Sequence, residues 1–349
     1  MSGHTAKISL CMIARNEEIF LPGCLNSALS FVDEIVLVDT GSTDRTAEIA
    51  KEAGARVHSF AWNDDFSAAR NYGLEQATGD WILWLDADEH LEVADGAKWR
   101  AALFDPSAQA YAMRIVSYCG EDEIKDDQAI LHAQIRLFRN GLGVRFEHRV
   151  HEQLNVRAVL PELRDIPFLP AHVHHFGYMD SIIEARDKWK RNEYLLATEQ
   201  EQPNYSPWVD YHLANLYYNK GKHGKAVDWV NQSIRRFLGR GEAPPSMLYK
   251  LKYEALLAGG KKDEAMQGID KALAMYPDYV DLHFIKGKLL YLERRYGEAE
   301  EQFMKCLELG EANPAYVIQK GTGSDLARRY AERCKNAGGT IGKEGGERR

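Results

Sequence analysis

The sequence is poor in cysteine, and its few cysteines are far apart. There are five in 349 residues, an odd number, and no two of them form a C-x-x-C pair. This spacing argues against a disulfide framework and against a thiolate zinc site. We therefore expect a reducing compartment, and we place the protein in the cytoplasm.

Long apolar runs and several common site motifs are also missing. The first residues lack the basic region, apolar core and cleavage site of a signal peptide, and no stretch approaches the roughly 20 apolar residues of a membrane span. Neither G-x-x-x-x-G-K nor G-x-G-x-x-G occurs, which argues against a P-loop and against a dinucleotide fingerprint. His151 and Glu152 do not begin the H-E-x-x-H motif of a zinc hydrolase, because position 155 is Asn155.

Basic residues are outnumbered by acidic ones. The chain has 44 Lys and Arg against 52 Asp and Glu, a formal net charge of -8. A protein that binds nucleic acid by neutralising phosphates needs a basic surface, so this balance argues against that class. The length, together with a hydrophobic content of 45%, predicts a globular protein of two or three domains.

Residues 81–91, W-I-L-W-L-D-A-D-E-H-L, form an apolar run that ends abruptly in acids. The five apolar residues are continuous, which is typical of a strand covered on both faces in a mainly parallel sheet. Asp86, Asp88 and Glu89 follow, and clustered carboxylates repel one another unless a cation compensates. Ligands bind at the carboxyl ends of such strands, so the D-x-D predicts a divalent metal there. A solvated turn whose acids cap the next helix is the structural alternative.

The first half alternates strand and helix patterns, which predicts right-handed βαβ units and a parallel sheet. Strands are expected at 7–14, 33–39, 55–60, 81–85, 111–118 and 134–139. Helices are expected at 21–31, 47–52, 68–77 and 96–104, with Ser67 as the N-cap of the third. Two later segments, 141–154 and 168–178, are rich in charge and histidine, and we expect them to contribute to a site.

The second half repeats a pattern of small residues. G-K-H-G-K-A ends at Ala226, G-K-K-D-E-A at Ala265 and R-R-Y-G-E-A at Ala299. Ala299 follows Ala265 by 34 residues, the tetratricopeptide period, and the first step is longer because of the loop 239–245. Small residues at these positions let paired helices approach closely, so the pattern predicts an α-solenoid. An ordinary helical bundle with accidental spacing is the alternative.

The chain resembles glycosyltransferases of family 2, which have the GT-A fold, in the subgroup that carries tetratricopeptide repeats after the catalytic domain. Sublancin-type peptide S-glycosyltransferases belong to that subgroup. The resemblance covers residues 8–178. It is carried by M-I-A-R-N-E-E, V-D-T-G-S-T-D-R-T, D-F-S-A-A-R-N, D-A-D-E, V-H-E at 150–152 and H-F-G-Y at 175–178. It implies an α/β GT-A domain with a Rossmann-like, mainly parallel sheet, followed by an all-α tetratricopeptide-like solenoid.

The resemblance implies a nucleotide-sugar donor, usually a uridine diphosphate sugar, bound across the carboxyl edge of the first strands. Asp39 matches the family's base-contacting acid, and Asp86 and Asp88 match its metal and ribose turn. Arg70 and Asn71 start a helix whose free N–H groups favour an anion, although packing explains Asn71 equally well. The expected donor-binding residues are Ala14, Asn16, Glu17, Asp39, Arg70, Asn71, Asp86, Ala87 and Asp88.

A cation is expected because the diphosphate leaving group develops negative charge as the glycosidic bond breaks. Mn²⁺ or Mg²⁺ suits a D-x-D, since both prefer oxygen ligands. The resemblance implies that His175 completes the metal shell from the last segment of the domain. The expected ligands are therefore Asp86, Asp88 and His175, and a structural role is the alternative for a single histidine.

An inverting transfer needs a base that takes the acceptor's proton while the acceptor attacks the anomeric carbon. Glu152 is the candidate for this base, with Glu147 and Glu89 in reserve. The structural alternative for Glu152 is an ion pair with Arg149 or Arg157, which share its segment.

Solenoids bind peptides or partner proteins more often than small molecules. We therefore expect a peptide or protein acceptor that docks on the repeats, and the repeats also allow an oligomer. A saccharide or lipid-linked acceptor is one alternative, and a scaffold that binds nucleotide sugar without turnover is another. The expected organisation is a catalytic domain at 1–180, a connector helix at 181–202, repeats and cap at 203–336, and a disordered tail at 337–349.

Overall fold

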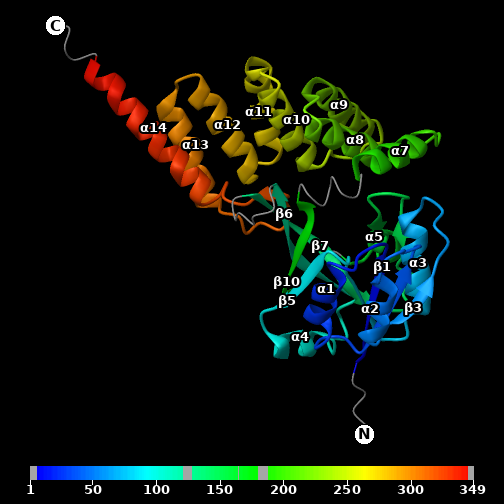
Figure 1. Ribbon diagram of the computed structural model, residues 1–349. Coiled ribbons are helices and arrows are strands. Elements are labelled where there is room, and N and C mark those ends of the chain that lie inside the picture. Colours follow the sequence, from blue (N-terminus) through cyan, green and yellow to red (C-terminus); the bar gives the residue numbers. More distant parts are fainter. Residues whose placement is uncertain (1–5, 121–127, 164, 180–187, 345–349) are drawn as a thin grey trace. The chain divides into compact units, whose positions relative to one another are not determined.

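The chain divides into two compact units (Figure 1). The computed structural model describes residues 6–120, 128–163, 165–179 and 188–344. The first unit comprises Met1–Asp122 and His132–Arg186, and the second comprises Glu123–Leu131 and Asp187–Arg349. The second unit is therefore discontinuous in sequence, because a short stretch from the first half of the chain belongs to it.

The first unit is built on one mixed sheet. Its strands are β1 (Ile8–Ala14), β2 (Glu34–Asp39), β3 (Arg56–Ser59), β4 (Trp81–Trp84), β5 (Glu89–Val93), β6 (Ala110–Gly120), β7 (Ala129–Arg139) and β10 (Phe168–Met179), in the order β3-β2-β1-β4-β7-β6-β10-β5. Neighbours from β3 to β4 are parallel, as are β6 and β10, whereas β7 is antiparallel to β4 and β5 is antiparallel to β10. The predicted α/β fold with a mainly parallel sheet is confirmed.

Both faces of the central strands are buried, as the continuous apolar run in β4 predicts. Trp81 and Leu83 belong to the core on one face, and Ile82 and Trp84 belong to the core on the other. Side chains from α1, α2 and α4 fill the first core, and side chains from α3 and α5 fill the second. The helices are α1 (Leu21–Ala28), α2 (Thr46–Glu52), α3 (Phe66–Gln76), α4 (Gly96–Ala102) and α5 (Val156–Val159).

The expected N-cap of α3 is wrong by two residues. The cap is Asp65, whose side chain accepts a hydrogen bond from the N–H of Ala68 at 3.0 Å. Ser67 instead lies inside the helix and donates its hydroxyl to Asp65 at 2.7 Å. A carboxylate at the cap also interacts favourably with the positive end of the helix dipole, so it is the better partner for the free N–H groups.

Strand β5 was not predicted. Its sequence, E-H-L-E-V, follows the acidic turn directly and looks like a continuation of it. Only Leu91 of this edge strand lies in the buried core, so the strand carries too little apolar alternation to be recognised from sequence.

The second unit is a stack of helix pairs. Its helices are α7 (Lys188–Gln200), α8 (Pro207–Asn219), α9 (His223–Gly239), α10 (Ser246–Ala258), α11 (Lys262–Met275), α12 (Val280–Leu292), α13 (Tyr296–Leu309) and α14 (Asp325–Glu344). Consecutive helices pack on each other along the stack, and α10 also contacts α8 and α12 (Figure 1). The expected connector at 181–202 falls within the described residues only from 188 onwards, where α7 begins.

The repeated small residues lie where paired helices meet. Ala226, Ala265 and Ala299 are completely buried in α9, α11 and α13. A Cβ atom added at Gly287 of α12 would lie 2.7 Å from the ring of Phe303 in α13. Residues without bulk therefore set the close approach of the helices, and the predicted solenoid is confirmed.

A segment that follows α13 packs back on the beginning of α12. Asp281 of α12 is buried and accepts hydrogen bonds from the N–H of Gln319 at 2.9 Å and the hydroxyl of Thr322 at 2.5 Å. Its other partner is Lys250 of α10, at 2.5 Å. The segment forms a short strand, β11 (Ile318–Gln319), which pairs antiparallel with residues 130–131 at the start of β7. These two residues are part of the stretch that belongs to the second unit.

The last helix is longer than expected. Residues 337–344, which we expected to be disordered, continue α14 to Glu344, and residues 345–349 lie outside the described part of the chain. Ala327, Ala331 and Cys334 of α14 are buried in the core of the last repeat. Once this packed part has formed, each further residue adds a helical hydrogen bond at low entropic cost, which explains the extension. Among the helices that the structure describes, none has the length and apolarity needed to cross a bilayer.

Candidate active site

The carboxyl ends of β1 and β2 form the edge at which the sequence predicted the donor. Ala14 is the register partner of Asp39. The carboxylate of Asp39 accepts a hydrogen bond from the N–H of Ser42 at 2.9 Å. Asn16 has a φ of 56° and accepts a hydrogen bond on its side chain from the N–H of Thr43 at 2.8 Å. Two of the predicted donor residues thus fix the loop after β2, so this edge is preorganised.

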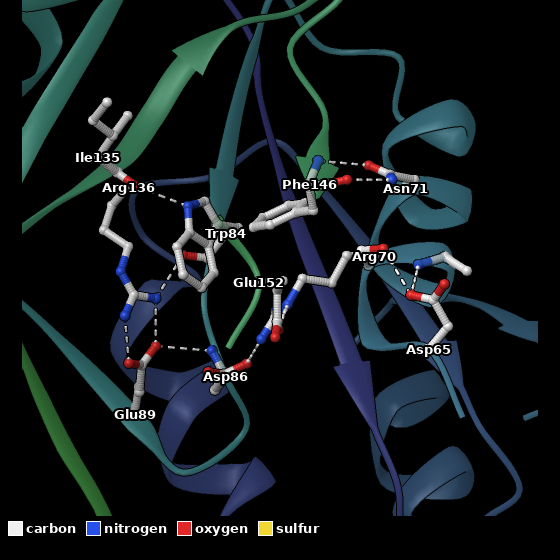
Figure 2. Close-up of polar contacts among 12 residues, drawn as sticks. Asp65, Arg70, Asn71, Trp84, Asp86, Glu89, Ile135, Arg136, Phe146 and Glu152 are labelled. Carbon is white, nitrogen blue, oxygen red and sulfur yellow. Dashed lines mark hydrogen bonds and ion pairs between the residues drawn. The ribbon is translucent and has the colours of Figure 1, made fainter. Parts of the chain in front are cut away.

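The D-x-D turn after β4 is held by the acid that follows it. The N–H of Asp86 donates to Oε2 of Glu89 at 2.8 Å. Arg136 of β7 donates to both oxygens of Glu89, at 2.7 and 2.6 Å (Figure 2). These two side chains are 3% and 1% exposed, and a bidentate pair of this kind is a strong charge-assisted contact. Glu89, one of the reserve bases, therefore supports the turn and is not available to an acceptor.

Sequence reasoning missed Arg136. Its guanidinium carbon lies 3.7 Å from the centre of the Trp84 ring, and Nη1 also donates to the Trp84 carbonyl at 3.3 Å. The signal for it was present in the strand Q-I-R-L-F-R. An arginine inside an apolar strand is costly to bury unless a carboxylate pairs with it, which would have pointed to an acidic partner.

Arg70 of α3 joins the acidic turn to the segment that carries Glu152 (Figure 2). Its Nε donates to Oε1 of Glu152 at 2.5 Å, and its Nη2 donates to Oδ1 of Asp86 at 2.7 Å. The Arg70 side chain is 8% exposed, and its guanidinium carbon lies 4.9 Å from the Trp84 ring and 5.3 Å from the Phe146 ring. Burial raises the pKa of Asp86, but the charges of Arg70 and Arg136 and the hydrogen bond from Arg70 together outweigh burial and hold that pKa below its usual value.

Glu152 lies in a segment with unusual backbone geometry. His148 and His151 have φ values of 75° and 54°, in the left-handed region that residues other than glycine seldom adopt. Such conformations persist only where surrounding contacts impose them, and they concentrate at functional sites. The Glu152 side chain is 12% exposed, and the ion pair that the structure gives it is with Arg70, a residue of α3 and not a neighbour in its own segment.

Asp88 and His175 come together where β10 lies beside β5. Nε2 of His175 is 3.5 Å from Oδ1 of Asp88, and the N–H of Phe176 donates to the Asp88 carbonyl at 3.1 Å. A Cβ atom at Gly177 would lie 2.4 Å from Oδ2 of Asp88 and 2.6 Å from Nε2 of His175, so both groups pack closely on the glycine and a side chain at this position would displace them. Burial lowers the pKa of His175, but the hydrogen bond and charge of Asp88 outweigh it, and the pKa is raised.

Asn71 and Glu147 lie at the side of the site. The amide of Asn71 donates to the Phe146 carbonyl at 2.9 Å and accepts from the Phe146 N–H at 2.8 Å. This ties α3 to β8 (Phe146–Glu147), which pairs with β9 (Gln153–Leu154). The geometry therefore supports the packing role for Asn71. Glu147, the second reserve base, is exposed on β8.

Arg70 joins the acidic turn to Glu152, and His175 lies beside Asp88 of the same turn. Ala14, Asn16 and Asp39 lie at or just after the neighbouring ends of β1 and β2. Within the described ranges, no three His, Cys, Asp or Glu side chains form a ready-made metal site. The Asp88–His175 pair is the part of the expected ligand set that is assembled. Mg²⁺ and Mn²⁺ sites of nucleotide enzymes typically take one or two protein ligands and complete the shell with phosphate oxygens and water.

A mainly parallel α/β sheet with a D-x-D turn at the end of its central strand defines a nucleotide-sugar glycosyltransferase of the GT-A type, here joined to stacked helix pairs. Residues 9–154 match the model of glycosyl transferase family 2, and residues 280–313 match a tetratricopeptide repeat. The chain belongs to glycosyl transferase family 2 and carries tetratricopeptide repeats after its catalytic unit.

Three known proteins are similar to this chain. A TPR repeat-containing protein of Synechococcus elongatus is 33% identical over 281 residues, which are 79% of this chain and 67% of that protein. The glycosyltransferase SunS of Bacillus subtilis is 29% identical over 247 residues, 67% of this chain. This chain spans about half of the length of SunS, 54%. Residues 1–349 of S. aureus TarS overlay with a TM-score of 0.39 at 15% identity, covering 77% of this chain and 91% of that one.

Proposed function

We propose that the protein is a metal-dependent, inverting glycosyltransferase that moves a sugar from a uridine diphosphate sugar to a peptide or protein acceptor. The observation that carries the proposal is the meeting of the D-x-D turn, His175 and Glu152 at one edge of the sheet, where Arg70 links the turn to Glu152 and His175 lies beside Asp88. Such a transfer requires a pair of side chains that can bind a cation and a base that can accept a proton. Both must lie next to the sheet edge that binds the nucleotide.

The donor lies across the ends of β1, β2 and β4 in this proposal. Asp39 contacts the nucleobase, and the backbone around Ala14, Asn16 and Glu17 forms the adjacent wall. Ala87, which is 4% exposed, holds the turn in the core between its two acids. The diphosphate then extends toward Asp88.

Asp88 and His175 would hold the cation, with Asp86 on the other side of the turn. Because Gly177 has no side chain, Oδ2 of Asp88 and Nε2 of His175 can lie close together, and a carboxylate oxygen and an imidazole nitrogen are both suitable ligands for such a cation. A bound Mn²⁺ or Mg²⁺ would supply positive charge that stabilises the diphosphate leaving group. Glu89 and Arg136 keep the turn in the conformation that presents Asp88.

Glu152 is the base. Arg70 engages its Oε1, so Oε2 is the atom that takes the proton from the acceptor. The acceptor atom forms its bond to the anomeric carbon while the bond from that carbon to the diphosphate oxygen breaks. The electron pair of that bond leaves with the nucleoside diphosphate, and the proton stays on Glu152.

The acceptor class is proposed from the repeats. Stacked helix pairs offer an extended surface of the kind that recognises polypeptide segments. The beginning of α12 is covered by the chain's own segment around Gln319 and Thr322, which leaves the surface of the first two repeats for an acceptor.

Release of nucleoside diphosphate tests the proposal. The protein is incubated with each common nucleotide sugar and Mn²⁺, with and without candidate peptides or oligosaccharides. We expect turnover of a uridine diphosphate sugar that a peptide stimulates. Asp88→Asn should abolish cation-dependent binding of uridine diphosphate, whereas Glu75→Gln, in an exposed ion pair with Arg145, should not. If only a saccharide stimulates turnover, the acceptor is a saccharide and not a peptide. If Asp88→Asn binds uridine diphosphate with Mn²⁺ as well as the wild type does, Asp88 is not a metal ligand.

A further inference from the structure

Arg70 has the surroundings of a fixed structural cation and not those of a ligand-binding arginine. Its Nε and Nη2 are already used by Glu152 and Asp86. Its guanidinium carbon lies 4.9 Å from the Trp84 ring and 5.3 Å from the Phe146 ring, and only 8% of its side chain is exposed. These two carboxylates and two rings therefore account for most of the surroundings of the guanidinium, and little of its surface is left for a donor phosphate.

The element that carries Arg70 is itself anchored at both ends of the site. Asp65 caps α3 one turn before Arg70. Asn71, the next residue, is hydrogen-bonded twice to the backbone of Phe146. The N–H of Phe66 donates to the carbonyl of Arg149 at 2.9 Å. Helix α3 is thereby tied to the segment that carries Glu152, so the guanidinium is held at a defined place relative to that carboxylate.

We infer that Arg70 is a positioning residue that acts through Glu152: it holds Oε1 so that Oε2 is presented to the acceptor, and it links the base to the turn that binds the donor. This inference rests on the proposed function. It differs from the donor contact expected from the sequence, because Arg70 here touches neither the donor nor the acceptor.

Arginine suits this role for two physical reasons. A guanidinium remains protonated at any pH at which the enzyme works, so it never competes with Glu152 for the acceptor's proton. Its planar fork also directs two N–H groups to two different carboxylates at once. A lysine has the same charge but a single ammonium group, and it cannot reproduce both contacts with the same geometry.

A double-mutant cycle on kcat tests the inference. Glu152→Gln alone removes the base and should lower kcat by about 10²–10⁴-fold. Arg70→Lys alone should lower kcat by at least about tenfold while the donor KM stays nearly unchanged. In the Glu152→Gln background, Arg70→Lys should cause almost no further loss, because two residues that act as a unit are not additive. Arg145→Lys, in the exposed pair with Glu75, is the matched control and should leave kcat unchanged.

Three results would overturn the inference. Losses that multiply in the double variant would mean that Arg70 does not act through Glu152. A raised donor KM with an unchanged kcat in Arg70→Lys would mean that Arg70 contacts the donor. A loss of kcat that follows a loss of folded protein, measured by circular dichroism in both Arg70→Lys and Arg70→Gln, would reduce its role to stability. Failure of the wild-type chain to turn over any donor would instead refute the proposed function.

Discussion

The guanidinium carbon of Arg136 lies 3.7 Å from the centre of the Trp84 ring. Trp84 is the last residue of β4, and Arg70 lies on the same ring at 4.9 Å. One indole therefore contacts two arginines through cation–π interactions. Each arginine binds a different acid, Glu89 or the Asp86–Glu152 pair. The end of a single buried strand thus fixes the positions of three carboxylates in the site.

We expect the buried ion pair of Arg136 and Glu89 to contribute to the stability of the first unit. Arg136→Ala would leave the Glu89 carboxylate buried without its partner, so we expect the free energy of unfolding to fall by about 3–5 kcal/mol. Arg145→Ala breaks an ion pair whose side chains are 55% and 52% exposed, and it should cost at most about 1 kcal/mol. Urea titrations of both variants, followed by tryptophan fluorescence, measure the difference. Equal losses would show that the Arg136 pair contributes little.

Replacing both members of that pair separates stability from function. Arg136→Met with Glu89→Leu removes two buried charges together, so most of the lost stability should return. The N–H of Asp86 would then have no side-chain acceptor at the turn. We expect a folded protein whose affinity for uridine diphosphate with Mn²⁺ is clearly reduced in isothermal titration. Wild-type affinity would show that the turn does not depend on Glu89.

Gly177 should tolerate no side chain. In Gly177→Ala the new Cβ would lie 2.4 Å from Oδ2 of Asp88 and 2.6 Å from Nε2 of His175, so both groups must move. We expect cation-dependent donor binding to fall by at least about tenfold, roughly 1.4 kcal/mol. Gly96→Ala is the matched control, since the nearest atom to its Cβ is 3.8 Å away in Phe31. Binding that survives in Gly177→Ala would exclude a cation at this pair.

Glu152→Gln should separate binding from transfer. The amide has nearly the same shape as the carboxylate but does not accept the proton, so the donor dissociation constant should stay close to that of the wild type. Transfer to the acceptor should fall by about 10²–10⁴-fold. Glu147→Gln, on the exposed side of β8, is the control. A larger loss in Glu147→Gln would transfer the role of base to that residue.

Glu34 should make the first unit sensitive to acid. It accepts hydrogen bonds from Ser9, from Arg56 and from the N–H of Thr78 at 2.8 Å. Burial raises the pKa of Glu34, but these hydrogen bonds outweigh burial and leave the pKa below its usual value of 4.5. A lowered pKa in the folded state stabilises the protein above that usual value, and the contribution is lost as the pH falls through the folded-state pKa.

The pH dependence of unfolding tests this sign. Glu34→Gln should be less stable than the wild type at about pH 7, and the difference should shrink as the pH falls through the folded-state pKa of Glu34, because below that pKa both side chains are uncharged. Glu48→Gln, on the exposed surface of α2, is the control. A difference that grows on acidification would contradict the assignment.

Local patterns in the sequence predicted much of the fold and part of the site. The apolar run of β4 and the acids after it are adjacent in the chain, so their arrangement could be predicted from the sequence. Arg136 and Glu89 are 47 residues apart, and Arg70 and Glu152 are 82 apart. Their meeting depends on the insertion of β7 as an antiparallel strand beside β4 and on the path of β8 and β9. Neither follows from periodicity, which reports which face a residue occupies but not which strand is its neighbour.

The boundary between the two units does not coincide with a single point in the chain. Residues 130 and 131 lie at the start of β7, between strands of the first unit in sequence, yet they pair with β11, which follows α13. A gene fragment that ends before the repeats, for example by deletion of residues 203–349, would encode these residues without their partner strand. Exchange of the repeats between related proteins by recombination at residues 180–187 would mismatch them in the same way. The second unit therefore draws on two separate parts of the chain, and a fragment that begins at residue 188 would lack the partner of β11.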